Sequence, residues 1–238
     1  MAEATTPDWL ERANRLALTS ALLSTTVHEV NNALQVISGS AEMLGPASPP
    51  DLIARRTEAI GAHARRASAL LAELSSFAKD ESTNTFSLDL AQIAHRALAM
   101  RQYTIAKLKL ESTFEATGEA RMVVANQRSI LQIVLNLIVN AEQALARKGG
   151  GVIRLSIRGE GKTVSLNVDD DGPGIEPAVA AKLFQPIALA ANTRLGIGLA
   201  VSKHLAERFG GTIAYGPGAS SGCRFTLTLP AADAPLQA

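Results

Sequence analysis

His28 is a candidate for chemistry, because a carboxylate, Glu29, follows it and an amide, Asn32, lies four positions on. Neutral imidazole is nucleophilic near pH 7. On a helix, Asn32 lies one turn above His28, and Glu29 and Asn32 are neighbours at three-residue spacing. A solvated histidine on the surface of an amphipathic helix is the alternative interpretation, and this stretch alone leaves both open.

Asn136 and Asn140 form a second candidate group, because two asparagines four positions apart share one face of a helix. Amide oxygens are hard, neutral ligands that suit Mg²⁺, which prefers oxygen donors and keeps several waters. Two asparagines on a helix are more often only solvated, so this pair needs support from other parts of the chain.

Three adjacent acids, Asp169, Asp170 and Asp171, end a strand pattern and precede a turn that contains Gly172 and Gly174. Glycine lets the backbone approach a ligand closely. A carboxylate here can accept a hydrogen bond from an exocyclic amine such as that of adenine. Adjacent carboxylates repel one another unless a ligand or a neighbouring group compensates their charge. The cluster therefore indicates more than an acidic turn.

Gly196 and Gly198 open a helical pattern, and bare backbone amides at a helix N-terminus form a site for phosphate. Before them, Phe184-Gln185-Pro186 and residues 187–194 read as a loop between two helices that is able to lie over a bound nucleotide.

Two long helices are expected to position His28. Helical spacing runs from Asp8 to Leu44 and again from about Asp51 to Lys79, with a proline-rich break between them. His28 lies about 200° around the helix from the apolar stripe and therefore points away from it. The stripe on the first helix consists of Leu16, Leu23, Val30, Ile37 and Leu44, flanked by Val27, Leu34 and Ala41.

A lone hairpin buries only the seam between its two helices, whereas two copies bury both stripes in a four-helix bundle. We therefore expect residues 1–80 to form a homodimeric helical domain. His63 flanks Ile60 and Ala67 of the second stripe, and we interpret it as structural.

Beyond a short polar linker, helical and strand patterns alternate, which predicts an α/β sandwich over residues 86–230 with helices on one face of a mixed sheet. The fold class is thus α+β, a helical hairpin followed by this sandwich. The expected helices are 90–101, 128–146 and 196–209, and the expected strands are 109–114, 122–125, 152–158, 164–168, 212–215 and 224–229.

Composition narrows the class of protein. The chain has 238 residues, a formal net charge of +1 and no block of Lys and Arg, so nucleic acid and anionic membranes are not expected partners. Cys223 is the single cysteine, which excludes an internal disulfide and fits a reducing compartment. No signal-peptide pattern and no apolar run of membrane-spanning length is evident, so we expect a cytoplasmic protein.

In their order and spacing, these motifs resemble the two-component sensor histidine kinases, whose Bergerat-type domain binds ATP. The resemblance covers roughly residues 10–230. The matching segments are Asn136–Gln143 (the N box), Asp170–Ile175 and Gly196–Ala200 (the two glycine boxes), Phe184–Pro186 (the phenylalanine box) and His28–Asn32 (the phosphoacceptor motif).

The resemblance implies that His28 attacks the γ-phosphate of ATP, while Glu29 holds the ring and accepts the proton from its other nitrogen. Glu29 and Asn32 also match the family's phosphatase motif, in which the amide positions a water to attack an aspartyl phosphate. The implied partner is the receiver domain of a response regulator.

The resemblance also implies the ATP and Mg²⁺ contacts. Asn140 would be the main Mg²⁺ ligand, and Asn136 would contact phosphate or the metal. Asp170 would accept a hydrogen bond from the amino group of adenine. The residues expected to shape the nucleotide pocket are Gly172, Gly174, Gly196 and Gly198.

The sequence departs from the family pattern at three places. Ala33 stands where proline often follows the paired asparagines, which predicts a straighter helix. Arg194 replaces the usual first glycine of the second glycine box. The lid is short and apolar, and it leaves Thr193 and Arg194 as the expected phosphate contacts, with Arg194 a cation near the γ-phosphate.

Three alternative functions share this architecture. They are a phosphotransfer or scaffold protein with a degenerate ATP-binding domain, a phosphatase that binds ATP only as a regulator, and an ATPase of the chaperone, mismatch-repair or anti-sigma-factor type. The last does not need a histidine on a helical hairpin. No sensor pattern is evident, so a signal is expected to arrive through a separate input protein or through the first helix.

Overall fold

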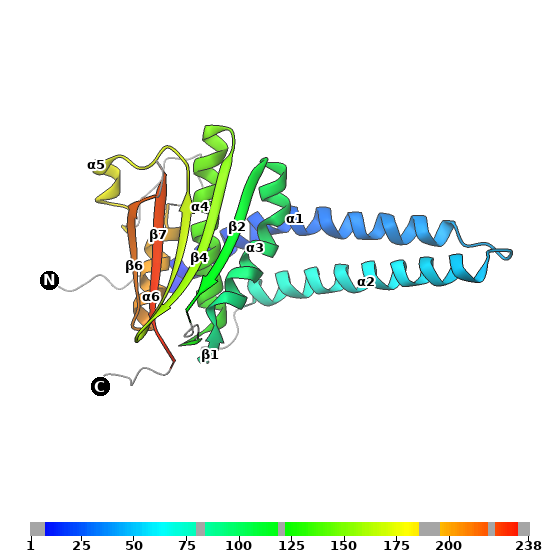
Figure 1. Cartoon of the computed structure of the whole chain (residues 1–238), viewed down its shortest axis with the longest axis horizontal. Helices are drawn as coiled ribbons and strands as arrows, with labels where there is room; N and C mark the ends of the chain where they lie inside the picture. The colour runs from blue at the N-terminus through cyan, green and yellow to red at the C-terminus, as the bar shows by residue number, and fades with distance from the viewer. Residues whose placement is uncertain (1–7, 80–83, 119–121, 186–195, 219–221, 233–238) are drawn as a thin grey trace. The chain divides into compact units, whose positions relative to one another are not determined.

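The computed structural model divides the chain into two compact units, and each is described here by itself. One unit is Thr19–Asp80, and the other combines Met1–Leu18 with Glu81–Ala238. The first 18 residues, which the helical pattern assigns to the hairpin, are thus grouped with the larger unit. The structure describes residues 8–79, 84–118, 122–185, 196–218 and 222–232 (Figure 1).

Helices α1 (Asp8–Glu42) and α2 (Pro50–Ala78) form the predicted antiparallel hairpin (Figure 1). α1 ends two residues earlier than its apolar pattern indicates, because a tight turn begins there. In this turn the Gly45 amide donates to Oγ of Ser48 at 2.9 Å. Pro50 is the first residue of α2, a position where a missing amide hydrogen is tolerated.

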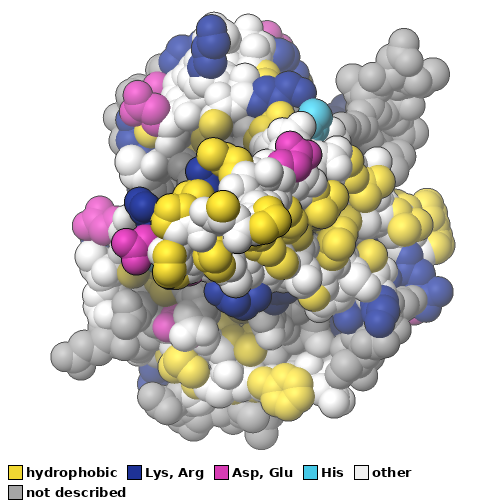
Figure 2. All heavy atoms as spheres, turned by 90° about the vertical axis from the view of Figure 1, so that its right-hand side faces the viewer, with side chains coloured by type: hydrophobic (Ala, Val, Ile, Leu, Met, Phe, Trp, Pro, Cys, Tyr) yellow, Lys and Arg dark blue, Asp and Glu magenta, His cyan; other side chains and the backbone are white. Residues whose placement is uncertain are grey.

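Part of the apolar stripe of α1 and of its flanking row is open to solvent in the single chain, whereas Val30 and Ile37 are half-buried. Leu23, Val27 and Leu34 are 47–50% exposed, whereas Ala33 and Ser40 are buried. Figure 2, which views the molecule from the right-hand side of Figure 1, shows hydrophobic side chains gathered in a band across the middle of the view. α1 continues without interruption through Ala33, as expected for alanine at a position where proline would kink the helix.

The larger unit is built on a mixed five-stranded sheet in the order β2-β4-β5-β7-β6. β2 pairs in parallel with β4, and the other three pairings are antiparallel. The strands are β2 (Leu110–Thr117), β4 (Gly151–Glu160), β5 (Thr163–Asp170), β6 (Thr212–Pro217) and β7 (Cys223–Pro230).

Three helices cover one face of this sheet (Figure 1), which confirms the predicted sandwich. α4 contacts β4 and β5, α3 contacts β2, and α6 contacts β6. The helices are α3 (Leu90–Lys107), α4 (Gln127–Lys148) and α6 (Gly198–Arg208).

The core follows from the side-chain periods of these elements. Alternate residues of the central strands point to the helices, as Ile153, Leu155 and Ile157 of β4 do, and all three are buried. α4 is long and apolar enough to cross a membrane by length and composition, but 78% of that window is buried inside the unit. α4 is therefore the core helix of the sandwich.

Two short elements carry little sequence signal. β1 (Phe86–Asp89) pairs with β3 (Met122–Ala125) in a separate antiparallel ribbon, and β1 is not evident from its own residues. α5 (Pro177–Ala180) is a single turn. Four residues are too few to establish a period.

Arg101 of α3 and Glu142 of α4 form an ion pair inside the helical layer, with both side chains 4% exposed. Arg101 donates from Nε to Oε1 of Glu142 at 2.9 Å and from a terminal nitrogen to Oε2 at 2.5 Å. Neither the heptad patterns nor the motifs point to this pair.

We expect Arg101→Met to lower the free energy of unfolding by about 3–5 kcal/mol, because it leaves the Glu142 carboxylate buried without its cation. Urea denaturation would measure this loss. The double variant Arg101→Met/Glu142→Leu should recover most of it, because an apolar pair leaves no buried charge. A single variant as stable as wild type would contradict the prediction.

Candidate functional site

Asn136 of α4 lies against the first turn of α6. It is 4% exposed, and its Nδ2 lies 3.1 Å from the carbonyl oxygen of Gly198 and 3.0 Å from Oγ of Ser202. A side chain at Gly198 would place a Cβ 3.1 Å from Oδ1 of Asn136, tighter than most real contacts. The N-box helix and the second glycine segment are therefore in direct contact.

Asn140 lies one turn further along α4. Its Nδ2 is buried and has no hydrogen-bond partner, one of two such side-chain atoms among the described residues. An unsatisfied buried polar group costs about 1–3 kcal/mol. A ligand would remove this cost, and an amide can turn to present its oxygen instead of its nitrogen.

The turn after β5 meets α4 on the other side of Asn140. A Cβ built at Gly172 would lie 3.3 Å from Cβ of Ala144 and 2.6 Å from Oδ1 of Asp170. Asn136, Asn140 and Ala144 are four residues apart and lie along one side of the helix. The two glycine segments thus contact α4 on either side of the unpaired Asn140 amide.

The three adjacent carboxylates have different surroundings. Asp169 accepts a hydrogen bond from Nε of Arg224 at 2.6 Å. Asp171 accepts from the Val152 amide at 2.8 Å and lies 3.5 Å from Nζ of Lys148. The Val152 hydrogen bond, and then Lys148, hold the pKa of Asp171 below its ordinary value.

Asp170 is buried and accepts hydrogen bonds from backbone amides. The amide of Gly172 donates to its Oδ1 at 2.8 Å, and the amide of Cys223 donates to the same carboxylate. Burial raises its pKa above the ordinary value, and these two amides offset only part of that shift. Asp169 and Asp171 are used structurally, which leaves Asp170 as the carboxylate suited to a ligand.

Gly174 and Gly196 complete the predicted glycine set. Gly174 has a φ of +77°, a left-handed conformation that favours glycine, so it is fixed by its turn. Gly196 is half-buried and precedes α6 by two residues. Phe184 is half-buried, whereas the predicted lid contacts Thr193 and Arg194 lie outside the described residues.

Cys223 is the residue near this site that sequence reasoning missed. It is 3% exposed and lies beside Asp170 at the start of β7, with the Tyr215 hydroxyl hydrogen-bonded to its thiol. Burial, and then the charge of Asp170, raise the pKa of the thiol to about 11. A single cysteine forms no sequence motif, and nothing in the sequence indicated that Cys223 lies near the nucleotide site.

We expect the alkylation of Cys223 by iodoacetamide to rise about tenfold per pH unit from pH 8 to 10, because only the thiolate reacts. Mass spectrometry would follow the reaction without interference, since the chain has one cysteine. In urea the rate should level off near pH 9, the ordinary pKa of a thiol. A native rate that levels off at the same pH would contradict the prediction.

The predicted phosphoacceptor residues lie on α1. His28 and Asn32 are exposed. Glu29 is half-buried and accepts a hydrogen bond at 3.1 Å from a terminal nitrogen of Arg66 on α2. This cation beside the proposed proton acceptor was not predicted, because the two residues are 37 positions apart on different helices.

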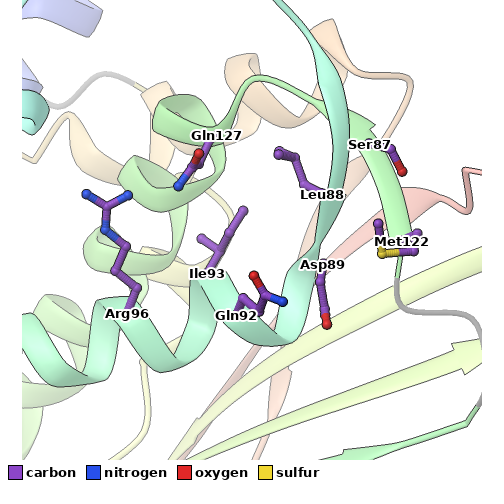
Figure 3. A pocket seen from close by; sticks show the side chains of 8 residues that line it. All are labelled: Ser87, Leu88, Asp89, Gln92, Ile93, Arg96, Met122 and Gln127. Carbon is purple, nitrogen blue, oxygen red and sulfur yellow. The ribbon is translucent and has the colours of Figure 1, made fainter.

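A separate pocket of about 400 Å³ lies beside the β1–β3 ribbon and the first turns of α3 (Figure 3). Asp89 caps α3 there, accepting a hydrogen bond from the Ala91 amide at 2.8 Å. None of the predicted site residues lines this pocket. Its lining consists of Ser87, Leu88, Asp89, Gln92, Ile93, Arg96, Met122 and Gln127.

Comparison with known families matches both parts of the chain. Residues 19–83 match the His Kinase A (phospho-acceptor) domain, and residues 125–233 match the histidine kinase-, DNA gyrase B- and HSP90-like ATPase family. The chain belongs to the two-component sensor histidine kinases.

Individual relatives agree with this assignment. The chain is 32% identical over 230 residues to the C4-dicarboxylate transport sensor protein DctS of Rhodobacter capsulatus. This match covers 93% of the chain and 35% of DctS. It is 27% identical to the sensor histidine kinase ZraS of Escherichia coli O157:H7 over 94% of the chain and 48% of ZraS. The chain thus spans less than half the length of these relatives.

A solved structure shows the same fold. The catalytic domain of the histidine kinase ThkA superposes with a TM-score of 0.57 at 23% identity, and the match covers 63% of this chain and 99% of that domain.

Proposed function

We propose that this chain transfers the γ-phosphoryl group of ATP to His28 and then to an aspartate on the receiver domain of a response regulator. The proposal rests on the buried Nδ2 of Asn140, which has no hydrogen-bond partner and lies between two glycine segments, with Asp170 beside one of them. The phosphotransfer-only alternative has no use for an intact adenine acceptor or for this amide.

The residues of the larger unit fit Mg²⁺ and ATP. Asn140 would hold Mg²⁺ through its amide oxygen, and Asp170 would accept a hydrogen bond from the adenine amino group. Mg²⁺, when bound, offsets the negative charge that develops as the phosphoryl group is transferred. Gly198 would leave room for phosphate at the start of α6.

His28 is exposed and on a helix, as an acceptor for a phosphoryl group must be. One imidazole nitrogen attacks the γ-phosphorus, the bond from that phosphorus to the β,γ-bridging oxygen breaks, and ADP leaves. The proton on the other nitrogen passes to Glu29. Arg66 holds the Glu29 carboxylate in the described structure, so Glu29 must exchange this cation for the imidazolium.

The proposal includes a homodimer, because the α1 stripe is exposed in the single chain and is long enough for a four-helix bundle. It places the chain in the cytoplasm, where ATP and receiver domains are available. Glu29 and Asn32 would also position the water that hydrolyses the aspartyl phosphate. Input would come from a separate sensor protein or through α1.

Incubation of the purified chain with γ-labelled ATP and Mg²⁺ tests this function. Label that is acid-labile and stable to alkali, and that moves to an added receiver domain, is the expected result. Absence of label at every ATP concentration would overturn the kinase assignment, and label accepted only from a phosphorylated receiver would support the phosphotransfer alternative.

A further inference from the structure

We propose that the first part of α1, residues 8–18, is an autoinhibitory segment that occupies the phosphate end of the nucleotide site. This inference builds on the proposed function, since it concerns the same site. The segment belongs to the same compact unit as the ATPase-like domain, whereas the rest of α1 belongs to the hairpin. We call residues 8–18 the docking segment.

The central contact is a reciprocal amide pair. Nδ2 of Asn14 donates to Oδ1 of Asn136 at 3.0 Å, and Nδ2 of Asn136 donates to Oδ1 of Asn14 at 3.0 Å. Nε2 of Gln132, one turn earlier on α4, lies 2.8 Å from the same Asn14 oxygen. Asn14 is 4% exposed, so water does not compete for these bonds.

Other residues of the docking segment support the contact. Leu10, Asn14 and Leu18 are four residues apart, form one helix face and are all at most 5% exposed. Glu11 accepts a hydrogen bond from Arg208 of α6 at 2.9 Å. The opposite face differs, since Trp9 and Leu16 are 65% and 64% exposed.

This contact uses the groups that a nucleotide would need. An asparagine side chain has two N–H groups and one oxygen. Nδ2 of Asn136 already has Asn14, Gly198 and Ser202 as acceptors within 3.1 Å, and its Oδ1 accepts from Asn14. A Cβ at Gly198 would lie 3.5 Å from Nδ2 of Asn14, so Asn14 lies beside the first residue of α6.

Docking and phosphate binding at Asn136 therefore exclude one another. A nucleotide must displace Asn14, so the affinity of the whole chain is reduced by the fraction of molecules in which the segment is docked. The docking segment and His28 belong to one continuous helix. Any input that draws the N-terminal part of α1 away from α4 would raise the affinity for ATP.

Asn14→Ala in the full chain tests the inference. We expect its Kd for ADP, measured by isothermal titration calorimetry, to be lower than that of wild type by roughly fivefold or more, a usual size for coupling between sites. Gln35→Ala is the matched control, because Gln35 is an exposed amide side chain on the same helix, outside both the docking segment and the phosphoacceptor motif. Its Kd should equal that of wild type.

A second measurement separates inhibition from a general loss of structure. Saturating ADP should increase hydrogen exchange of the backbone amides in residues 10–18 of the wild-type chain, because the bound nucleotide displaces the segment.

Three results would overturn the inference. The first is an unchanged Kd for ADP in Asn14→Ala. The second is a higher Kd in Asn14→Ala, which would make Asn14 a nucleotide contact. The third is exchange of residues 10–18 that saturating ADP does not increase. Measurable binding by wild type in these cases leaves the proposed function intact. If wild type, Asn14→Ala and Gln35→Ala all fail to bind ADP, both the inference and the proposed function are overturned.

Discussion

His28→Gln is expected to reduce acid-labile phosphorylation of the chain to background, while the Kd for ADP stays within about twofold of wild type. Glutamine keeps a polar side chain on the exposed face of α1 but has no nucleophilic nitrogen. The change lies outside the unit that holds Asn136, Asn140 and Asp170, so nucleotide binding should persist. Labelling with γ-labelled ATP and calorimetry with ADP measure the two properties.

His63→Gln is the matched control for this experiment. His63 lies on α2 of the same hairpin and is half-buried, so the same substitution is made in the same unit without touching the phosphoacceptor motif. Phosphorylation should continue at the wild-type extent. Label that persists in His28→Gln, or that disappears in His63→Gln, would contradict the assignment of His28.

Asp170→Asn is expected to raise the Kd for ATP by roughly 10- to 150-fold, the equivalent of about 1.5–3 kcal/mol for a hydrogen bond to a charged group. The substitution converts one oxygen acceptor into a donor at the position proposed for the adenine amine. Asp169→Asn is the control, because Asp169 is paired with Arg224 instead. Calorimetry should show an unchanged Kd for Asp169→Asn, and equal losses in both variants would contradict the role of Asp170.

The raised pKa of Asp170 has a consequence for pH dependence. Adenine binding needs the ionised acceptor, so affinity should fall as pH drops through this raised pKa, and not only near 3.8. The folding stability that Asp170 contributes has the opposite pH dependence. Burial favours the neutral form, so the stabilising contribution of Asp170 is complete below the unfolded pKa and is lost as pH rises through the folded one. Asp171, with its lowered pKa, contributes stability that is lost as pH falls.

Much of the fold is accessible from the sequence because its elements are long and periodic. The hairpin helices were predicted to within two residues at each end, and α4 and β3 were equally clear. β1 was not predicted, because it gains its structure by pairing with β3, and the paired residues lie from 33 (Asp89 and Met122) to 39 (Phe86 and Ala125) positions apart. Local periodicity contains no such pairing.

The kind of site and its candidate residues were predictable from the sequence, but the hydrogen bonds and ion pairs that join them to other elements were not. Asp170 was chosen from the motif, yet the cations that satisfy Asp169 and Asp171 come from β7 and from the end of α4. The Asn14–Asn136 pair joins residues 122 positions apart, and Asn14 has no motif of its own. Contacts of this kind depend on tertiary packing and are not encoded in the spacing of neighbouring residues.

Because apolar side chains of the hairpin are exposed in one chain, the stability of the hairpin should depend on protein concentration. Among the residues of α2, only Ala67 and Phe77 are buried in the single chain, so one copy of the hairpin has a small core of its own. A second copy that covers Leu23, Val27 and Leu34 adds free energy that grows with the logarithm of protein concentration. Dilution should therefore loosen the phosphoacceptor helix before it affects the sandwich, which has a complete core within one chain.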